Sequence, residues 1–107
     1  MDAFSVFTAE LEKKLKAENL PIRNLSVNFL SNGIANFTYD GFQIGRIYFG
    51  KRMSKMQIID SESVIWLENE PLENYIANID KWIKYIIDVR EEFLKNNETL
   101  KNLGIEI

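Results

Sequence analysis

The 107-residue sequence predicts a single two-layer α+β domain spanning residues 1–107. In this fold a four- or five-stranded antiparallel β-meander is flanked by an N-terminal helix and a long C-terminal helix. Three observations favour it. Apolar residues recur at helical spacing at both ends of the chain, and short segments between them alternate apolar with polar residues. Asn-Gly and Asp-Gly pairs separate those segments, and both pairs favour tight hairpin turns. The predicted element order is therefore α-β-β-β-β-(β)-α.

The first helix is expected over residues 3–19. Asp2 precedes it and can cap its free backbone N–H groups. Pro21 follows Leu20 and should end it. One narrow apolar stripe runs along this segment at the i, i+3 and i+4 positions, which indicates a surface helix with one buried side; the stripe consists of Phe4, Phe7, Leu11 and Leu15.

The strands of the meander follow directly. We expect them at residues 24–30, 35–39, 42–49 and 56–60. Asn32-Gly33 and Asp40-Gly41 mark the first two hairpin turns. Strands joined by such short turns pair antiparallel. Residues 63–67 are compatible either with a fifth strand or with the approach to the last helix.

The last helix is expected from Pro71, a residue suited to a first helical turn, to about Asn97. Its apolar arc is wider than a helix that only covers a sheet requires, because it extends through Trp82 and Val89 to Tyr85. Two readings follow: the first helix packs on Trp82 and Val89, or Trp82 and Tyr85 form a ridge for a partner. Residues 97–104 suggest one more short turn that stops at Gly104, followed by a frayed end or an edge strand.

Arg90 is unusual because helical periodicity places it in the middle of the apolar face. An unpaired buried cation would be very costly. We therefore expect the helix to have passed the edge of the sheet at this point. The arginine stem should lie along apolar surface with its charged group in water, or the guanidinium should form a buried ion pair with a glutamate.

The composition excludes several kinds of chemistry. The chain has no cysteine, so a disulfide scaffold, a thiolate zinc site and a cysteine nucleophile are all excluded. It has no histidine either, which removes the Ser-His-Asp triad and the commonest metal ligand. No glycine-rich phosphate-binding loop occurs. Asp60 and Glu62 are the carboxylate pair with metal-site spacing, but Val64 stands where a nuclease-like site would need lysine. We therefore expect no catalytic residues, no cofactor and no metal.

A basic stretch, GRIYFGKRMSK at residues 45–55, suggests nucleic-acid binding. Its candidate contacts are Arg46, Tyr48, Lys51, Arg52 and Lys55, and no acid occurs from residue 41 to 59. Strand alternation places Arg46 and Tyr48 on one face, with Ile47 and Phe49 on the other, so only one of the two aromatics could stack on a base. The chain carries a net charge of −3, and charged residues are ordinary in a turn. The plainer interpretation is a solvated strand end.

An acidic stretch follows at once, with six acids and no base from residue 60 to 80. Part of it has a local explanation, because Glu70 and Glu73 stand at a helix N-terminus, where the helix dipole favours anions. The functional interpretation is an acidic patch for a basic partner, which would act mainly on association rate and specificity. Its candidate contacts are Glu62, Glu68, Glu70 and Glu73.

The compositional setting favours a small protein of the cytoplasm. No run of 18 apolar residues occurs, and the N-terminus lacks a basic region followed by an apolar block, so neither a membrane contact nor a secretory signal is expected. Abundant isoleucine and asparagine with scarce arginine are typical of AT-rich bacterial and phage genomes.

The function that remains is a non-enzymatic protein-interaction module, of the kind encoded by phages, prophages and other mobile elements. Its partner would be a protein, with a second copy of the chain among the candidates. The expected contacts are the acidic patch, the aromatic helix ridge or both: Glu62, Glu68, Glu70, Glu73, Trp82 and Tyr85. The alternative is a nucleic-acid-binding protein that uses the basic strand and turn at residues 46–55.

Overall fold

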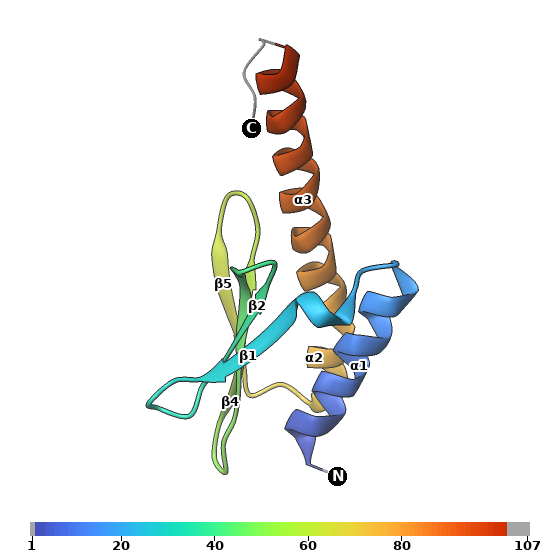
Figure 1. Cartoon of the computed structure of the whole chain (residues 1–107). Coiled ribbons are helices and arrows are strands. Elements are labelled where there is room, and N and C mark those ends of the chain that lie inside the picture. The colour runs from blue at the N-terminus through green and yellow to red at the C-terminus, as the bar shows by residue number, and fades with distance from the viewer. Residues whose placement is uncertain (1, 103–107) are drawn as a thin grey trace.

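The computed structural model describes residues 2–102, with side chains described through Asn96, and it confirms the predicted α+β architecture (Figure 1). The helices are α1 (Ala3–Ala17), α2 (Leu72–Ala77) and α3 (Ile79–Asn102), with a 3-10 turn η1 (Ile22–Asn24). The strands are β1 (Leu25–Phe29), β2 (Ala35–Tyr39), β3 (Phe42–Phe49), β4 (Ser54–Ile59) and β5 (Val64–Glu68).

The five strands form one antiparallel sheet in the order β1-β2-β3-β4-β5. The open question about residues 63–67 is thereby answered, since β5 pairs with β4 along its whole length. The β2–β3 turn has the positive φ angles that its Asp-Gly pair predicts, 53° at Asp40 and 85° at Gly41. Two successive positive φ angles match the right-handed twist of the flanking strands, which is why this dipeptide gives tight hairpins.

All three helices lie on one face of the sheet, and the core lies between the two layers (Figure 1). Helix α1 contributes the buried stripe that its spacing predicts: Phe7, Leu11 and Leu15. The sheet contributes inward-facing residues from its central strands: Phe37, Tyr39, Ile44, Ile47 and Met56. Among residues 2–102, no helix covers the other face, which we call the open face.

A β-bulge interrupts the pairing of β2 with β3. Phe37 stands opposite Gly45, whereas its neighbour Thr38 stands opposite Gln43, so Ile44 is the extra residue on β3. A bulge of this kind bends its strand and changes the direction of neighbouring side chains. Here it leaves both Ile44 and Gly45 buried beneath the helices.

The predicted single helix from residue 71 to 97 is wrong in one respect, because the chain forms two helices. Helix α2 ends at Ala77, and α3 begins at Ile79 and continues to Asn102. The residue between them is Asn78, whose side-chain Nδ2 donates a hydrogen bond to the carbonyl of Asn74 at 2.7 Å. An asparagine side chain that competes for the backbone in this way disfavours the helix interior. Residues 97–102 belong to α3, and 103–107, where we expected the Gly104 stop and a terminal segment, lie outside the described residues.

Strand β1 is less buried than its alternating pattern predicts. Val27 and Phe29 face the helix layer but are 41% and 60% exposed. The cause is the position of β1 at the edge of the sheet, where Phe4 of α1 contacts Phe29 with the ring centroids 5.2 Å apart.

Helix α3 extends well past the sheet (Figure 1). Its buried residues, Ile79, Trp82, Ile83 and Ile86, all lie within its first eight residues. From Glu91 to Asn96 every side chain is exposed. The chain consequently measures 55 Å along its longest axis and about half that across, 26 by 24 Å. None of the described helices has both the length and the apolar character that crossing a membrane requires.

Candidate functional site

Trp82, predicted as part of an exposed ridge, is a core residue, and that prediction is corrected here. It has no exposed surface, and its ring centroid lies 5.3 Å from that of Phe7 and 5.4 Å from that of Phe37. Its Nε1–H donates a hydrogen bond to the backbone carbonyl of Gln57 at 2.7 Å. The first helix therefore packs on Trp82, as the internal reading of the wide apolar arc predicts, whereas Val89, which that reading also placed under the first helix, lies near Asp40 and Phe42. The indole is not available to a partner.

Tyr85 is partly buried rather than a free contact. Its ring packs edge-on against Phe42 of β3, with centroids 6.0 Å apart. Trp82 and Tyr85 together explain most of the width of the apolar arc by contacts within the chain. The exposed apolar part of α3 lies farther along the helix.

That exposed part forms what we call the α3 surface, defined by Phe42, Val89, Phe93 and Leu94. Phe93 and Leu94 are 64% and 61% exposed. Together with Asp40 and Arg90, these four residues line a hollow of about 620 Å³ between α3 and the β2–β3 turn. Sequence periodicity places Leu94 with the sheet-covering residues, but it does not reveal that the sheet ends before α3 does.

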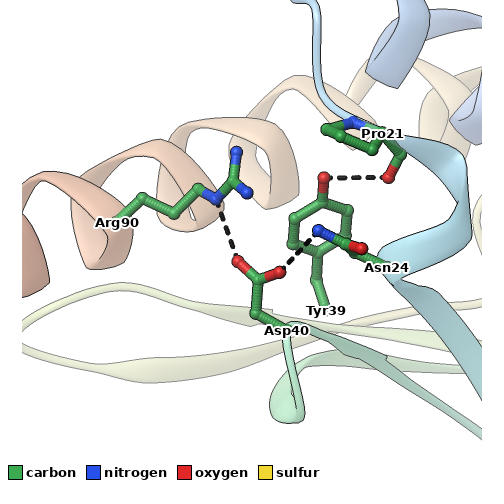
Figure 2. Close-up of polar contacts among 5 residues, drawn as sticks. All are labelled: Pro21, Asn24, Tyr39, Asp40 and Arg90. Atoms are coloured by element: carbon green, nitrogen blue, oxygen red, sulfur yellow. Dashed lines mark hydrogen bonds and ion pairs between the residues drawn. The ribbon is translucent and has the colours of Figure 1, made fainter.

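Arg90 closes the inner side of this hollow and fastens α3 to the sheet (Figure 2). Its Nε donates to Asp40 Oδ2 at 2.9 Å, and its guanidinium lies 5.4 Å from the ring centre of Tyr39. Asn24 Nδ2 donates to the other oxygen of Asp40 at 2.8 Å, and the Tyr39 hydroxyl donates to the carbonyl of Pro21 at 2.9 Å. Arg90 therefore forms an ion pair, which is one of the two arrangements expected for it, but its partner is an aspartate rather than a glutamate and the pair is partly exposed rather than buried.

The buried hydroxyl of Tyr39 gives this cluster a pH dependence that can be measured. Burial raises the pKa of Tyr39 above its ordinary value of 10.0, against the opposing effect of the Arg90 charge. A pKa that is higher in the folded state means that the associated stability is present below about pH 10 and is lost as the pH rises through the folded-state pKa.

Tyr39→Phe should therefore destabilise the protein by about 0.5–1.5 kcal/mol at neutral pH, because the hydrogen bond to Pro21 is lost. The difference from the wild type should shrink above about pH 10, since only the wild type must then keep a buried phenol from ionising. Urea unfolding of both proteins at neutral and at alkaline pH measures this. A difference that stays constant with pH would contradict the assignment.

The four candidate glutamates do not form one patch. Strand β5 separates Glu62 from Glu68, and six residues of extended chain span about 20 Å. Glu68 lies on the open face opposite Lys55, whereas α2, which carries Glu73, packs on the other face. Glu70 is half-buried and accepts a hydrogen bond from Asn74 Nδ2 at 3.0 Å. The local explanation is sufficient for Glu70 and Glu73, at the start of α2.

Asp60 and Glu62 lie in the β4–β5 turn rather than on a strand. Asp60 Oδ1 accepts hydrogen bonds from the backbone N–H groups of Glu62 and Ser63 at 2.8 and 2.7 Å. These bonds, the one from Glu62 first, lower the pKa of Asp60. The carboxylate therefore shapes the turn. Across the described residues, no group of three or more acidic side chains could hold a metal ion.

The open face holds the strand residues predicted for nucleic acid. Arg46 and Tyr48 lie on this face of β3, and Lys55 stands opposite Tyr48 on β4. Arg46 Nε donates to Asn36 Oδ1 at 3.1 Å, and Asn36 Nδ2 in turn donates to Asn28 at 3.3 Å. The first of these bonds ties the guanidinium to β2.

Lys51 and Arg52 are exposed in the turn that joins β3 to β4. The turn is closed by a hydrogen bond from the Gly50 N–H to the carbonyl of Met53 at 2.9 Å. All five residues predicted for nucleic acid are thus brought to one end of the sheet.

The structure adds Trp66, which the sequence analysis missed. It lies on the open face of β5, is 38% exposed and sits under Lys55, whose Nζ is 4.9 Å from the ring centre. The sequence does contain a signal for it. If residues 63–67, SVIWL, are assigned to a strand, alternation places Trp66 on the opposite face from Ile65 and Leu67. The open face therefore presents two aromatic rings, Tyr48 and Trp66, on either side of Lys55.

Comparison with protein-family models, curated proteins and solved structures finds no match for this chain. A functional argument therefore depends on the two surfaces described above: the α3 surface and the open face.

Proposed function

We propose that this protein is a non-enzymatic interaction module that binds a protein partner through the α3 surface. The single observation that carries the proposal is the exposure of Phe93 and Leu94, 64% and 61%, on a helix that has already left the sheet. Single exposed apolar side chains are ordinary on a protein surface, but large apolar side chains that form a contiguous exposed patch mark interaction sites.

The shape of the α3 surface supports this proposal. Phe93 and Leu94 stand beside a hollow of about 620 Å³ whose floor includes Phe42 and Val89. A partner can therefore receive two protruding side chains and place one of its own in the hollow. Aromatic residues that fill such hollows supply a large share of binding energy. A second copy of the chain is one such partner, because it offers both features at the same place.

The helix itself gives a second reason. Residues 91–96 expose every side chain, so this part of α3 gains little from packing within the chain. Isolated helices shorter than about 12–15 residues are marginal in water, and most helices in proteins depend on tertiary contacts. A partner that covers Phe93 and Leu94 would supply those contacts.

The setting that we propose is the one the composition favours: the cytoplasm of an AT-rich bacterium, with the gene in a phage, prophage or other mobile element. The lack of cysteine and histidine supports a non-enzymatic role. The glutamates of the acidic stretch have a smaller part in this proposal, because they lie on different sides of the domain.

The test is a double variant, Phe93→Ser with Leu94→Ser. We expect it to weaken partner binding about 30-fold or more, corresponding to a loss of at least ~2 kcal/mol at two central apolar contacts. Sedimentation over a range of concentrations measures self-association, and pull-down from a lysate of the source organism with mass spectrometry measures binding to other proteins. The matched control is Val27→Ser with Phe29→Ser, which removes comparable exposed apolar surface from β1.

The result depends on the difference between the two double variants. Loss of self-association or of a discrete retained protein in the α3 variant, with retention in the β1 control, supports the proposal. A monomeric wild type that retains the same proteins as the α3 variant would overturn it. Circular dichroism on each variant verifies that the fold is intact.

A further inference from the structure

The open face differs in charge from the rest of the chain. Its strand residues include two cations, Arg46 and Lys55, and one carboxylate, Glu68. The adjoining turn adds Lys51 and Arg52. These five residues carry a net charge of +3 in a chain of net charge −3, whereas the two acids of the β4–β5 turn, Asp60 and Glu62, lie at the opposite end of β4. A cationic region of this kind is complementary to phosphates, whose neutralisation dominates binding to nucleic acid.

The aromatic residues of the open face are arranged for stacking. Tyr48 of β3 and Trp66 of β5 are separated by Lys55 of β4, so the two rings stand on alternate strands. Base stacking on exposed aromatic rings contributes about 1–3 kcal/mol per base and tolerates any sequence. Lys55 Nζ lies over the Trp66 ring, 4.9 Å from its centre, so it must move aside for a base to stack there, and it can then neutralise a neighbouring phosphate.

A row of amide side chains completes this face. Asn28 and Asn36 bond to each other, and Gln43 Nε2 donates to Gln57 Oε1 at 2.6 Å. Gln57 is buried, but the exposed Asn28 has amide N–H groups that its bond with Asn36 does not use, and these can donate to base edges. A broad sheet cannot enter the groove of a duplex, and bases must be unstacked to reach its aromatic rings, so this arrangement fits single strands.

We propose that the open face binds single-stranded nucleic acid, with Arg46, Lys51, Arg52 and Lys55 on the phosphates and with Tyr48 and Trp66 stacked on bases. The site is independent of the α3 surface, because the helices and the open face lie on opposite sides of the sheet (Figure 1). Both surfaces can therefore be occupied at once.

The experiment titrates the full chain into fluorescently labelled mixed-sequence oligonucleotides of about 20 nucleotides, longer than the site of one small domain. Single-stranded RNA, single-stranded DNA and duplex DNA form three arms, read by fluorescence anisotropy. Intrinsic fluorescence gives a second readout: Trp66 is exposed and Trp82 is buried, so quenching on binding reports Trp66.

We expect both single strands to bind more tightly than the duplex and to quench the tryptophan signal. With three or four phosphates neutralised, raising the salt concentration about fourfold should weaken binding roughly 20- to 50-fold. Trp66→Leu should weaken binding at least about fivefold and abolish the quenching. Lys55→Ala should weaken binding and reduce the salt dependence.

The matched control is Lys13→Ala with Lys16→Ala, which removes exposed cations from α1 in the helix layer. Retention of binding in this control supports the assignment to the open face. Three results would each overturn the proposal: no binding at low salt, a control that loses as much affinity as Lys55→Ala, or binding that leaves tryptophan fluorescence unchanged. Circular dichroism on each variant verifies its fold.

Discussion

Replacing Trp82 by alanine is expected to lower the free energy of unfolding by about 3–5 kcal/mol, the usual cost of deleting a buried large aromatic side chain. Trp82 has no exposed surface and packs against Phe7 of α1 and Phe37 of β2. It therefore joins α1 and α3 to the sheet. A chain of this size is stable by about 5–15 kcal/mol, so the variant should lose a large share of its stability.

Trp82→Phe is the informative control for this prediction. Phenylalanine keeps much of the contact with Phe7 and Phe37 but cannot donate to the carbonyl of Gln57. The lost hydrogen bond leaves a buried acceptor unsatisfied, at a cost of about 1–3 kcal/mol. Urea unfolding followed by far-UV circular dichroism measures both variants.

The two interpretations of Trp82 predict opposite results. An exposed ridge residue would leave stability almost unchanged and would reduce partner binding when mutated. Mutation of a core residue, by contrast, must lower the free energy of unfolding. A loss below about 1 kcal/mol in Trp82→Ala would contradict the packing described here.

The strands were predictable because their signals are local. Alternation of apolar and polar residues fixes which side chains share a face, and Asp40-Gly41 fixes the turn between β2 and β3. The same reasoning correctly placed Arg46 and Tyr48 on one face and Ile47 on the other, where it is buried. Antiparallel order then follows from the short connections.

The apolar surface of α3 was not predictable in the same way. Helical periodicity shows that Trp82, Val89 and Leu94 all belong to the wide apolar arc of α3, but the burial of each depends on what stands opposite it. Trp82 faces α1 and the sheet, whereas Leu94 lies past the point where the sheet ends. The distinction requires the relative lengths of sheet and helix, which no local pattern contains.

Trp66 illustrates a different limit. Its partners on the open face come from β3 and β4, and the Lys55 contact joins residues eleven positions apart through the register of β4 with β5. That register cannot be derived from the sequence until residues 63–67 are assigned to a strand. One ambiguous segment therefore hid half of the aromatic content of the open face.

Gly45→Ala is expected to destabilise the protein by about 1–3 kcal/mol. The sign of this change in the free energy of unfolding shows whether the packing of residue 45 or its intrinsic strand propensity dominates. Alanine normally improves a strand relative to glycine by about 0.5–1 kcal/mol. At this position, however, an added Cβ would lie 2.3 Å from an indole carbon of Trp82, closer than real Cβ contacts allow. The indole cannot retreat, since Phe7 and Phe37 hold its ring and Gln57 holds its N–H.

A double-mutant cycle tests whether Trp82 is the cause. In a Trp82→Phe background the ring is smaller, so Gly45→Ala should cost less, and the coupling free energy should fall in the range of about 0.5–3 kcal/mol found for residues in contact. Gly41→Ala is the matched control. Gly41 has a φ of 85° but no neighbour within 4 Å of an added Cβ, so its cost is one of backbone conformation and should not change with residue 82. If Gly45→Ala lowers the free energy of unfolding equally in both backgrounds, contact with Trp82 is not the cause of the destabilisation. A reduced cost would show that the bulge at Ile44 and the glycine after it exist to seat Trp82 against the sheet.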